Sequence, residues 1–467
     1  MKNLMILFFI ARVGALSAQP AFDHWFEDKT LRIDYVHTGD ATGEQISLET
    51  LYQEGEWPGR TIFLLDTLNL GQYLARVIDA ESGQLIYSQG FSSVYGEWET
   101  TDEAKTLRRS ISETVRIPYP RRPVTFDIHK RDRVNRFQFL WSVNIDPSSR
   151  AVNREKKNVR LRTRKLIDNG DPKQKVDVAI MGDGYTQNDL RKFRRDVEHF
   201  IQVLFSSPPF DECRRDFNVW AVESVSSEHG IDEPRENIWR DTILGAQYNA
   251  FDVSRYVLTF NNRSVRDVAA LVPYDAIYIL INSSQYGGGG IFNQYAICYT
   301  GERENQPAWW ADYVFVHEFG HSFAALADEY YTSDVAYNDL YPLDVEPWEP
   351  NITTLQCDGK AKWHDLLTPG LPVPTPWGKA AYDSLSALRN NGNNVQEIGE
   401  QMDKLLKSPE LLGKIGCFEG GGYASQGVYR PALNCRMFSK SLVEFCPVCK
   451  QAIRQMIDFT VGRSSVD

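Results

Sequence analysis

The sequence lacks a second long apolar run, an excess of basic residues, and any internal repeat or low-complexity tract. A helix that crosses a bilayer needs about 20 apolar residues, and no stretch after the N-terminal run reaches that length. The formal net charge of −11 disfavours nucleic acid or an anionic membrane surface as the main partner. We therefore expect neither a membrane span in the mature chain nor a nucleic-acid partner.

The first residues are typical of a secretory signal peptide. Lys2 precedes a short apolar run over residues 4–11, and small residues lead from there to Ala18. The run is too short for a stable anchor, and no cysteine follows it to carry a lipid. We predict a signal peptide over residues 1–18, cleavage after Ala18, and a secreted or periplasmic protein.

The seven cysteines fit an exported chain, in which disulfides persist. Cys446 and Cys449 have the spacing of a redox or zinc-ribbon pair. A ribbon, however, needs a second cysteine pair, and a thioredoxin-like site needs its pair to begin a helix in a βαβ unit. We expect disulfides among the C-terminal cysteines, with at least one cysteine left over. The seven are Cys213, Cys298, Cys357, Cys417, Cys435, Cys446 and Cys449.

Two regions with different patterns follow the signal peptide. With 467 residues, of which 42% are hydrophobic, the chain can form two or three domains with sizeable cores. Residues 20–150 contain β-prone segments separated by Gly, Pro and Asp/Ser turns, which predicts a β-sandwich accessory domain. The polar stretch 150–164 is the expected linker to a second domain over residues 165–467.

The second region alternates strands and helices, which predicts an α+β or α/β domain with a mixed sheet. Residues 176–181 read as a buried strand, and Thr186 then opens an amphipathic helix. Strands are also expected over residues 217–222 and 275–282, the latter leading to four glycines at 287–290. These glycines let another backbone approach closely, so they form either a substrate-pairing edge or a plain flexible loop.

The most informative run is HEFGH at residues 317–321. On a helix, residues four apart share a face, so His317 and His321 can bind one Zn²⁺ while Glu318 points to its open side. The pair lies off the apolar stripe that includes Phe315, Phe319, Phe323 and Leu326, which we expect to be buried. The pattern predicts the HExxH helix of a zinc peptidase.

A catalytic zinc ion needs a third protein ligand. Asp328 and Glu329 lie eleven and twelve residues after His317, whereas the metzincin pattern places its third ligand ten residues after the first His and behind a glycine. Here alanines replace the glycine. Another alternative, a Glu on a later helix, is disfavoured because Glu346 and Glu349 are flanked by prolines. We choose Asp328 first and Glu329 second.

Several motifs in order resemble one known family, the secreted bacterial IgA-peptidase-type zinc metallopeptidases. They span about residues 165–460 and read GDGYT at 182–186, YGGGG at 286–290, HEFGHSFAALADEY at 317–330, GCFEGGGY at 416–423, YRP at 429–431 and FCPVC at 445–449. Met437 follows the YRP motif in an expected turn, and a methionine in a turn beneath the zinc is a second metzincin signature. The resemblance implies a secreted endopeptidase with a metzincin-like catalytic domain behind a small β-rich domain. Its substrate would be a protein or peptide, with a host glycoprotein among the candidates.

The expected mechanism uses Zn²⁺ held by His317, His321 and Asp328, with Glu318 as the general base that activates water. Four tyrosines are unranked candidates for stabilising the oxyanion: Tyr330, Tyr331, Tyr423 and Tyr429. The alternative is a secreted binding module whose zinc is structural or absent.

Overall fold

The structure is a computed structural model that describes residues 19–155, 160–301, 307–332, 340–356, 358–391, 395–441 and 443–464. The predicted signal peptide and Cys357 lie outside these residues. Among the described helices, none is both long enough and apolar enough to cross a bilayer.

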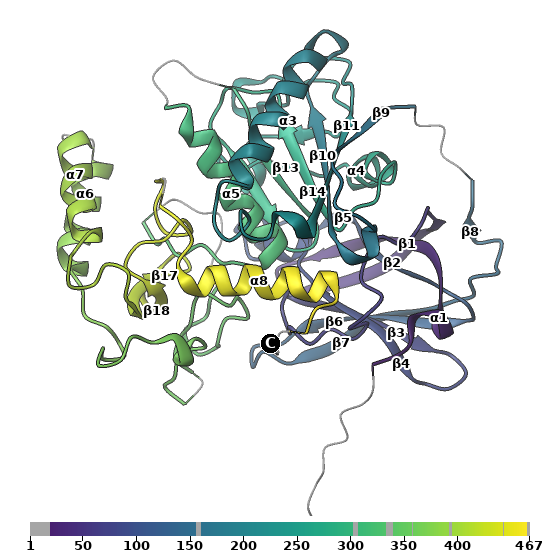
Figure 1. The fold of residues 1–467 in the computed structure, drawn as a ribbon, viewed down its shortest axis with the longest axis horizontal. Helices are drawn as coiled ribbons and strands as arrows, with labels where there is room; N and C mark the ends of the chain where they lie inside the picture. The colour runs from purple at the N-terminus through teal and green to yellow at the C-terminus, as the bar shows by residue number, and fades with distance from the viewer. Residues whose placement is uncertain are drawn as a thin grey trace, which may run out of the picture.

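The N-terminal region is built from two four-stranded sheets that enclose one core (Figure 1). In β3 every second residue is buried, as expected for a strand with one face toward a core. Ile33, Val77 and Phe126 meet in this core from both sheets. The first sheet has the order β5 (Arg109–Pro120), β1 (Phe26–Asp40), β2 (Gly43–Gln53), β8 (Val152–Asn153), and the second the order β4 (Leu85–Phe91), β3 (Tyr73–Asp79), β6 (Val124–Arg131), β7 (Phe137–Ile145). The short helices α1 (Phe22–Trp25) and α2 (Val94–Trp98) flank these strands.

The second region contains a six-stranded mixed sheet. Strand β10 lies inside it and pairs in parallel with β11 and β14, which explains why all its residues are buried and its sequence is continuously apolar from Val178 to Met181. Helices α3 and α5 lie on one face and α4 on the other (Figure 1). The order is β15 (Gly288–Ile291), β16 (Tyr295–Tyr299), β14 (Ala276–Ile281), β10 (Val176–Asp183), β11 (Phe217–Glu223), β9 (Arg162–Ile167). The helices are α3 (Leu190–Leu204), which follows a capping box at Thr186, α4 (Asn262–Ala269) and α5 (Trp309–Ala324). The expected N-terminal sheet domain and mixed-sheet second domain are thus both present.

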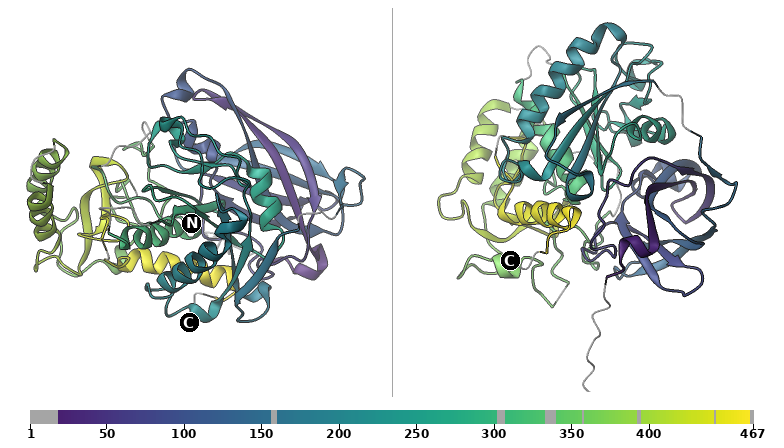
Figure 2. Two further views of the ribbon diagram at one scale, coloured as in Figure 1. Left: turned by 90° about the horizontal axis from the view of Figure 1, so that it is seen from above. Right: turned by 45° about the vertical axis from the view of Figure 1, so that its right-hand side comes forward.

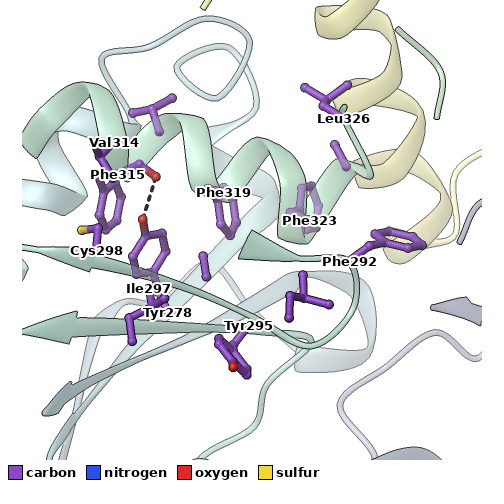
Figure 3. Close-up of a cluster of buried hydrophobic side chains, with 14 of the residues drawn as sticks. Tyr278, Phe292, Tyr295, Ile297, Cys298, Val314, Phe315, Phe319, Phe323 and Leu326 are labelled. Carbon is purple, nitrogen blue, oxygen red and sulfur yellow. Dashed lines mark hydrogen bonds between the residues drawn. The ribbon is translucent and has the colours of Figure 1, made fainter. Parts of the chain in front are cut away.

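Helix α5 carries the HEFGH run and is held on the sheet by its aromatic stripe (Figure 3). Phe315 stacks on Tyr278 of β14 with ring centroids 4.0 Å apart, and the Tyr278 hydroxyl donates a hydrogen bond of 2.9 Å to the Phe315 carbonyl. Phe319 and Phe323 continue the buried face. Leu326 is buried too, but it lies beyond the helix, which ends because Ala325 adopts a left-handed conformation with φ 58°.

The C-terminal part of the chain returns to the second domain. The hairpin of β17 (Ile415–Gly421) and β18 (Ala424–Ala432) lies beside the helices α6 (Lys379–Asn390) and α7 (Val395–Leu406) in both views of Figure 2. The last helix, α8 (Pro447–Val461), packs against α5 and β10. A short two-stranded ladder, β12 (Ala246–Gln247) with β13 (Leu258–Thr259), completes the described strands.

The two domains share an extensive contact. Tyr95 and Trp98 of α2 belong to the same buried cluster as the second domain's sheet. Arg32 of β1 forms an ion pair of 2.6 Å with Asp267 of α4. The N-terminal domain is therefore placed where it can form part of a site on the second domain.

Candidate metal centre

Three of the predicted site residues converge at the end of α5. The Nε2 atoms of His317 and His321 are 3.1 Å apart, and Asp328 Oδ1 lies 2.9 Å from the first and 3.3 Å from the second. Ligand atoms placed tetrahedrally around zinc at about 2.0–2.1 Å would be about 3.3 Å apart. The spacing of the three atoms therefore fits ligands of a single metal ion.

The chain reaches this position through a turn of alanines. Ala325 is left-handed, and the Leu326 N–H donates a 3.2 Å hydrogen bond to the Gly320 carbonyl, which closes the helix. A residue other than glycine thus makes the turn, at the cost of one strained backbone position.

The structure separates the two candidate third ligands. Asp328 faces the histidines, whereas the next residue, Glu329, faces away from them and accepts a hydrogen bond from Cys449. Glu346 and Glu349 line the neighbouring cleft but do not join the group.

Backbone carbonyls orient both imidazoles. His317 Nδ1 donates to the Arg436 carbonyl at 3.2 Å, and His321 Nδ1 donates to the Leu326 carbonyl at 2.5 Å. With Nδ1 carrying the proton, each Nε2 presents its lone pair to the space shared with Asp328. This is the arrangement of histidines prepared for a cation.

The Asp328 carboxylate also fits a metal. Its Oδ2 accepts a 2.6 Å hydrogen bond from Tyr423, but its Oδ1 is buried and has no aligned hydrogen bond from any described residue. Burial alone would raise the pKa of this carboxyl, yet His321 and His317 hold it well below its usual value. Burial likewise lowers the pKa of His321, but Asp328 raises it to about 9. A divalent cation bound there would displace the proton that His321 carries below this pKa.

Glu318 lies on the cleft side of α5. Burial is the largest influence on its carboxyl and raises the pKa. Strand β15 runs directly across from it: a Cβ on Gly290 would come within 2.5 Å of the Glu318 carbonyl oxygen.

The glycine run 287–290 is therefore neither a flexible loop nor a fully open edge. Residues 288–290 belong to β15, where α5 packs too closely for a side chain at Gly288 or Gly290, and the Val257 carbonyl does so at Gly289. The Gly288 carbonyl already accepts a 3.0 Å hydrogen bond from Val257 N–H, so part of the outer edge is occupied.

A cleft of about 510 Å³ opens over the three converging residues. His317, Glu318 and His321 form its floor, and Glu97, Glu99 and Arg131 of the N-terminal domain line its side. No sequence motif marks these residues of the N-terminal domain as part of the site.

The four candidate tyrosines divide into two pairs. Tyr330 and Tyr423 line the cleft. Tyr331 instead donates a 2.7 Å hydrogen bond to Asp383, and Tyr429 pairs with the backbone of Thr353, outside the cleft lining. Arg255, which no sequence pattern singled out, lies in the cleft with its guanidinium 5.9 Å from the Tyr330 ring centroid.

Met437 lies against α5. It is fully buried, and a Cβ added to Gly320 would come 3.3 Å from its sulfur. Its carbonyl accepts a 2.8 Å hydrogen bond from the Glu329 N–H, so this turn supports the segment that presents Asp328.

Comparison with known families agrees with this arrangement. The protein-family model described as IgA Peptidase M64 matches residues 165–457, and the family model described as Peptidase M64 N-terminus matches residues 21–142. A search among curated proteins finds no match. Since the peptidase model alone covers more than half of the 467 residues, the chain belongs to the IgA peptidase M64 family of peptidases.

Proposed function

We propose that this protein is a secreted, zinc-dependent endopeptidase of metzincin-like type. In this proposal His317, His321 and Asp328 hold the zinc ion, and Glu318 is the general base. The observation that carries it is the convergence of two imidazole Nε2 atoms and one carboxylate oxygen within 3.3 Å on the floor of an open cleft.

A zinc ion bound there supplies Lewis acidity, which polarises a carbonyl and acidifies water. Glu318 takes the proton from the attacking water and later delivers it to the leaving amine nitrogen. Its raised pKa brings proton uptake closer to neutral pH. Tyr330 lines the cleft and would donate to a developing oxyanion, whereas the Tyr423 hydroxyl already donates its proton to Asp328 Oδ2.

The chemistry of the cleft supports a catalytic rather than a structural metal. Three protein ligands leave a position open, whereas structural zinc sites are closed by four. The volume of about 510 Å³ lies within the range of substrate sites. This favours the enzyme over the alternative of a binding module.

Substitution Glu318→Gln tests the general base. The amide keeps the size of the side chain but cannot accept the proton, so kcat should fall by about 10²–10⁴-fold on a protein substrate while the zinc content stays unchanged. Glu410→Gln, at an exposed position outside the cleft, is the matched control and should retain full activity. Retained activity in purified Glu318→Gln would refute this role.

Export is the second part of the proposal. It is supported by the apolar run after Lys2 and by the small residues that end at Ala18. Mass spectrometry of the protein expressed in its own host should find a mature N-terminus at Gln19 in the periplasm or the medium. Full-length protein confined to the cytoplasm would contradict it.

A further inference from the structure

Four buried side chains that play no part in the proposed mechanism meet on the far side of Asp328. They are Glu329, Cys435, Cys446 and Cys449, each no more than 5% exposed. One potential ligand atom from each lies within 4.8 Å of all the others. Three segments supply them: the stretch after α5, the turn after β18, and the first turn of α8.

The sulfur atoms are too far apart for a disulfide. Cys435 Sγ and Cys449 Sγ are separated by 3.8 Å, whereas a disulfide bond is about 2.05 Å long. All six described cysteines are free, so the disulfides expected at the C-terminus are not formed among them. Two thiolates bound tetrahedrally to zinc at about 2.3 Å would lie about 3.8 Å apart.

The carboxylate in the cluster calls for a cation. Glu329 Oε1 accepts hydrogen bonds from Asn351 at 3.0 Å and from the Cys449 thiol at 3.2 Å. Its Oε2 is buried and has no partner among the described residues. The guanidinium of buried Arg430 is directed at three backbone carbonyls instead. An uncompensated buried carboxylate is costly, and coordination to a metal removes the cost.

The backbone around the sulfur atoms favours thiolates. The Cys446 N–H donates to Cys435 Sγ at 3.2 Å, and the Cys449 N–H donates to Cys446 Sγ at 3.5 Å. Cys446 is the N-cap of α8, so the positive end of a 15-residue helix also faces the cluster.

We propose that Glu329, Cys435, Cys446 and Cys449 bind a second Zn²⁺ in a closed, structural site. Cys446 and Cys449 supply two ligands, and Cys435 and Glu329 supply the other two from distant segments. Three thiolates and one carboxylate complete a tetrahedral zinc site, and thiolate ligands favour zinc over magnesium or calcium.

The second site would also organise the first. Glu329 is the neighbour of Asp328, and Met437 follows Cys435 by two residues, so one ion would tie α8 to both segments that lie against the catalytic helix. Its role is therefore to position the third ligand of the metal centre rather than to contact substrate.

Metal counting on the full-length protein tests the proposal. Purified wild type should contain two zinc ions per chain, and His321→Ala, which disrupts only the proposed catalytic centre, should retain one. After exchange with Co²⁺, His321→Ala should still show the near-ultraviolet charge-transfer absorption of sulfur bound to cobalt. A centre of two histidines and an aspartate has no sulfur and cannot produce that band.

Substitutions in the cluster provide the reciprocal test. Cys449→Ala should lose the charge-transfer band and one zinc ion, whereas Cys417→Ala, equally buried but outside the cluster, should keep both. If Cys449→Ala does not fold, Glu329→Gln keeps the volume of the side chain and should weaken zinc retention against a chelator by at least tenfold.

The outcomes separate this proposal from the proposed function. A wild type that contains a single zinc ion and shows a strong charge-transfer band after exchange with Co²⁺ would support the cysteine site and contradict the catalytic one. Absence of zinc from His321→Ala would overturn the cysteine site. Peptide mapping without reductant that finds the three cysteines of the native protein in disulfides would also overturn it.

Discussion

Replacing Asn351 with leucine would test how the protein holds Asp328 in the proposed metal centre. Asn351 is fully buried and forms hydrogen bonds to the residues on both sides of Asp328. Its Oδ1 accepts the Ala327 N–H at 2.7 Å, and its Nδ2 donates to the Ala327 carbonyl at 2.9 Å and to Glu329 at 3.0 Å. Leucine has a similar size and can make none of these bonds.

The expected loss of stability follows from the three hydrogen bonds of Asn351. A neutral hydrogen bond contributes about 1 kcal/mol and one to a charged group about 1.5–3 kcal/mol, so Asn351→Leu should lower the free energy of unfolding by about 4 kcal/mol. Asn218 is a closely matched control. It is fully buried at the opposite side of the same domain, accepts one backbone N–H, and donates to one backbone carbonyl and to the Asp177 carboxylate.

The two variants should lose similar stability in guanidinium unfolding but differ in metal affinity. Loss of support for a ligand weakens a metal site about 10–100-fold. Titration of activity with buffered free zinc should therefore shift by that factor for Asn351→Leu and stay unchanged for Asn218→Leu. Equal zinc affinities for the two folded variants would refute the idea that Asn351 positions the third ligand.

Three further predictions concern other parts of the molecule. Burial lowers the pKa of His37, but hydrogen bonds to glutamates of β2 and β5 raise it to about 9. Since this lies above the unfolded value of about 6.5, the stabilisation is complete below pH 6.5 and lost as the pH rises through 9. The free energy of unfolding should therefore fall by about 3 kcal/mol over this range. The prediction would be wrong if the free energy of unfolding depended on pH equally in the wild type and in His37→Gln. Tyr423→Phe removes a 2.6 Å hydrogen bond to the third ligand and should raise the zinc concentration for half-maximal activity about tenfold; an unshifted zinc titration would argue against it. Gly290→Ala should push β15 away from the Glu318 backbone and destabilise the protein by about 1–3 kcal/mol. Gly399→Ala, where an added Cβ meets nothing, should not be destabilising in the same thermal assay.

The sequence by itself determined those features that depend on local spacing. His317 and His321 share a face of one helix because four residues make about one turn. The apolar run from Val178 to Met181 marks a buried strand, and Phe315, Phe319 and Phe323 mark the buried face of α5, as observed.

Tertiary structure decided which distant groups meet. Asp328 and Glu329 are both acidic and adjacent, so the fold of the segment after α5, held by Asn351, decides which one faces the histidines. Cys435 lies beside Cys446 and Cys449 only because α8 folds back against α5, and this replaces the expected disulfides with a cluster of thiols.

The cleft also depends on tertiary structure. Glu97 and Arg131 line the cleft through the packing of two domains, and no periodicity in the chain records that contact. Local patterns follow from the geometry of a helix or strand, whereas a site assembled from separate segments depends on how their surfaces pack together.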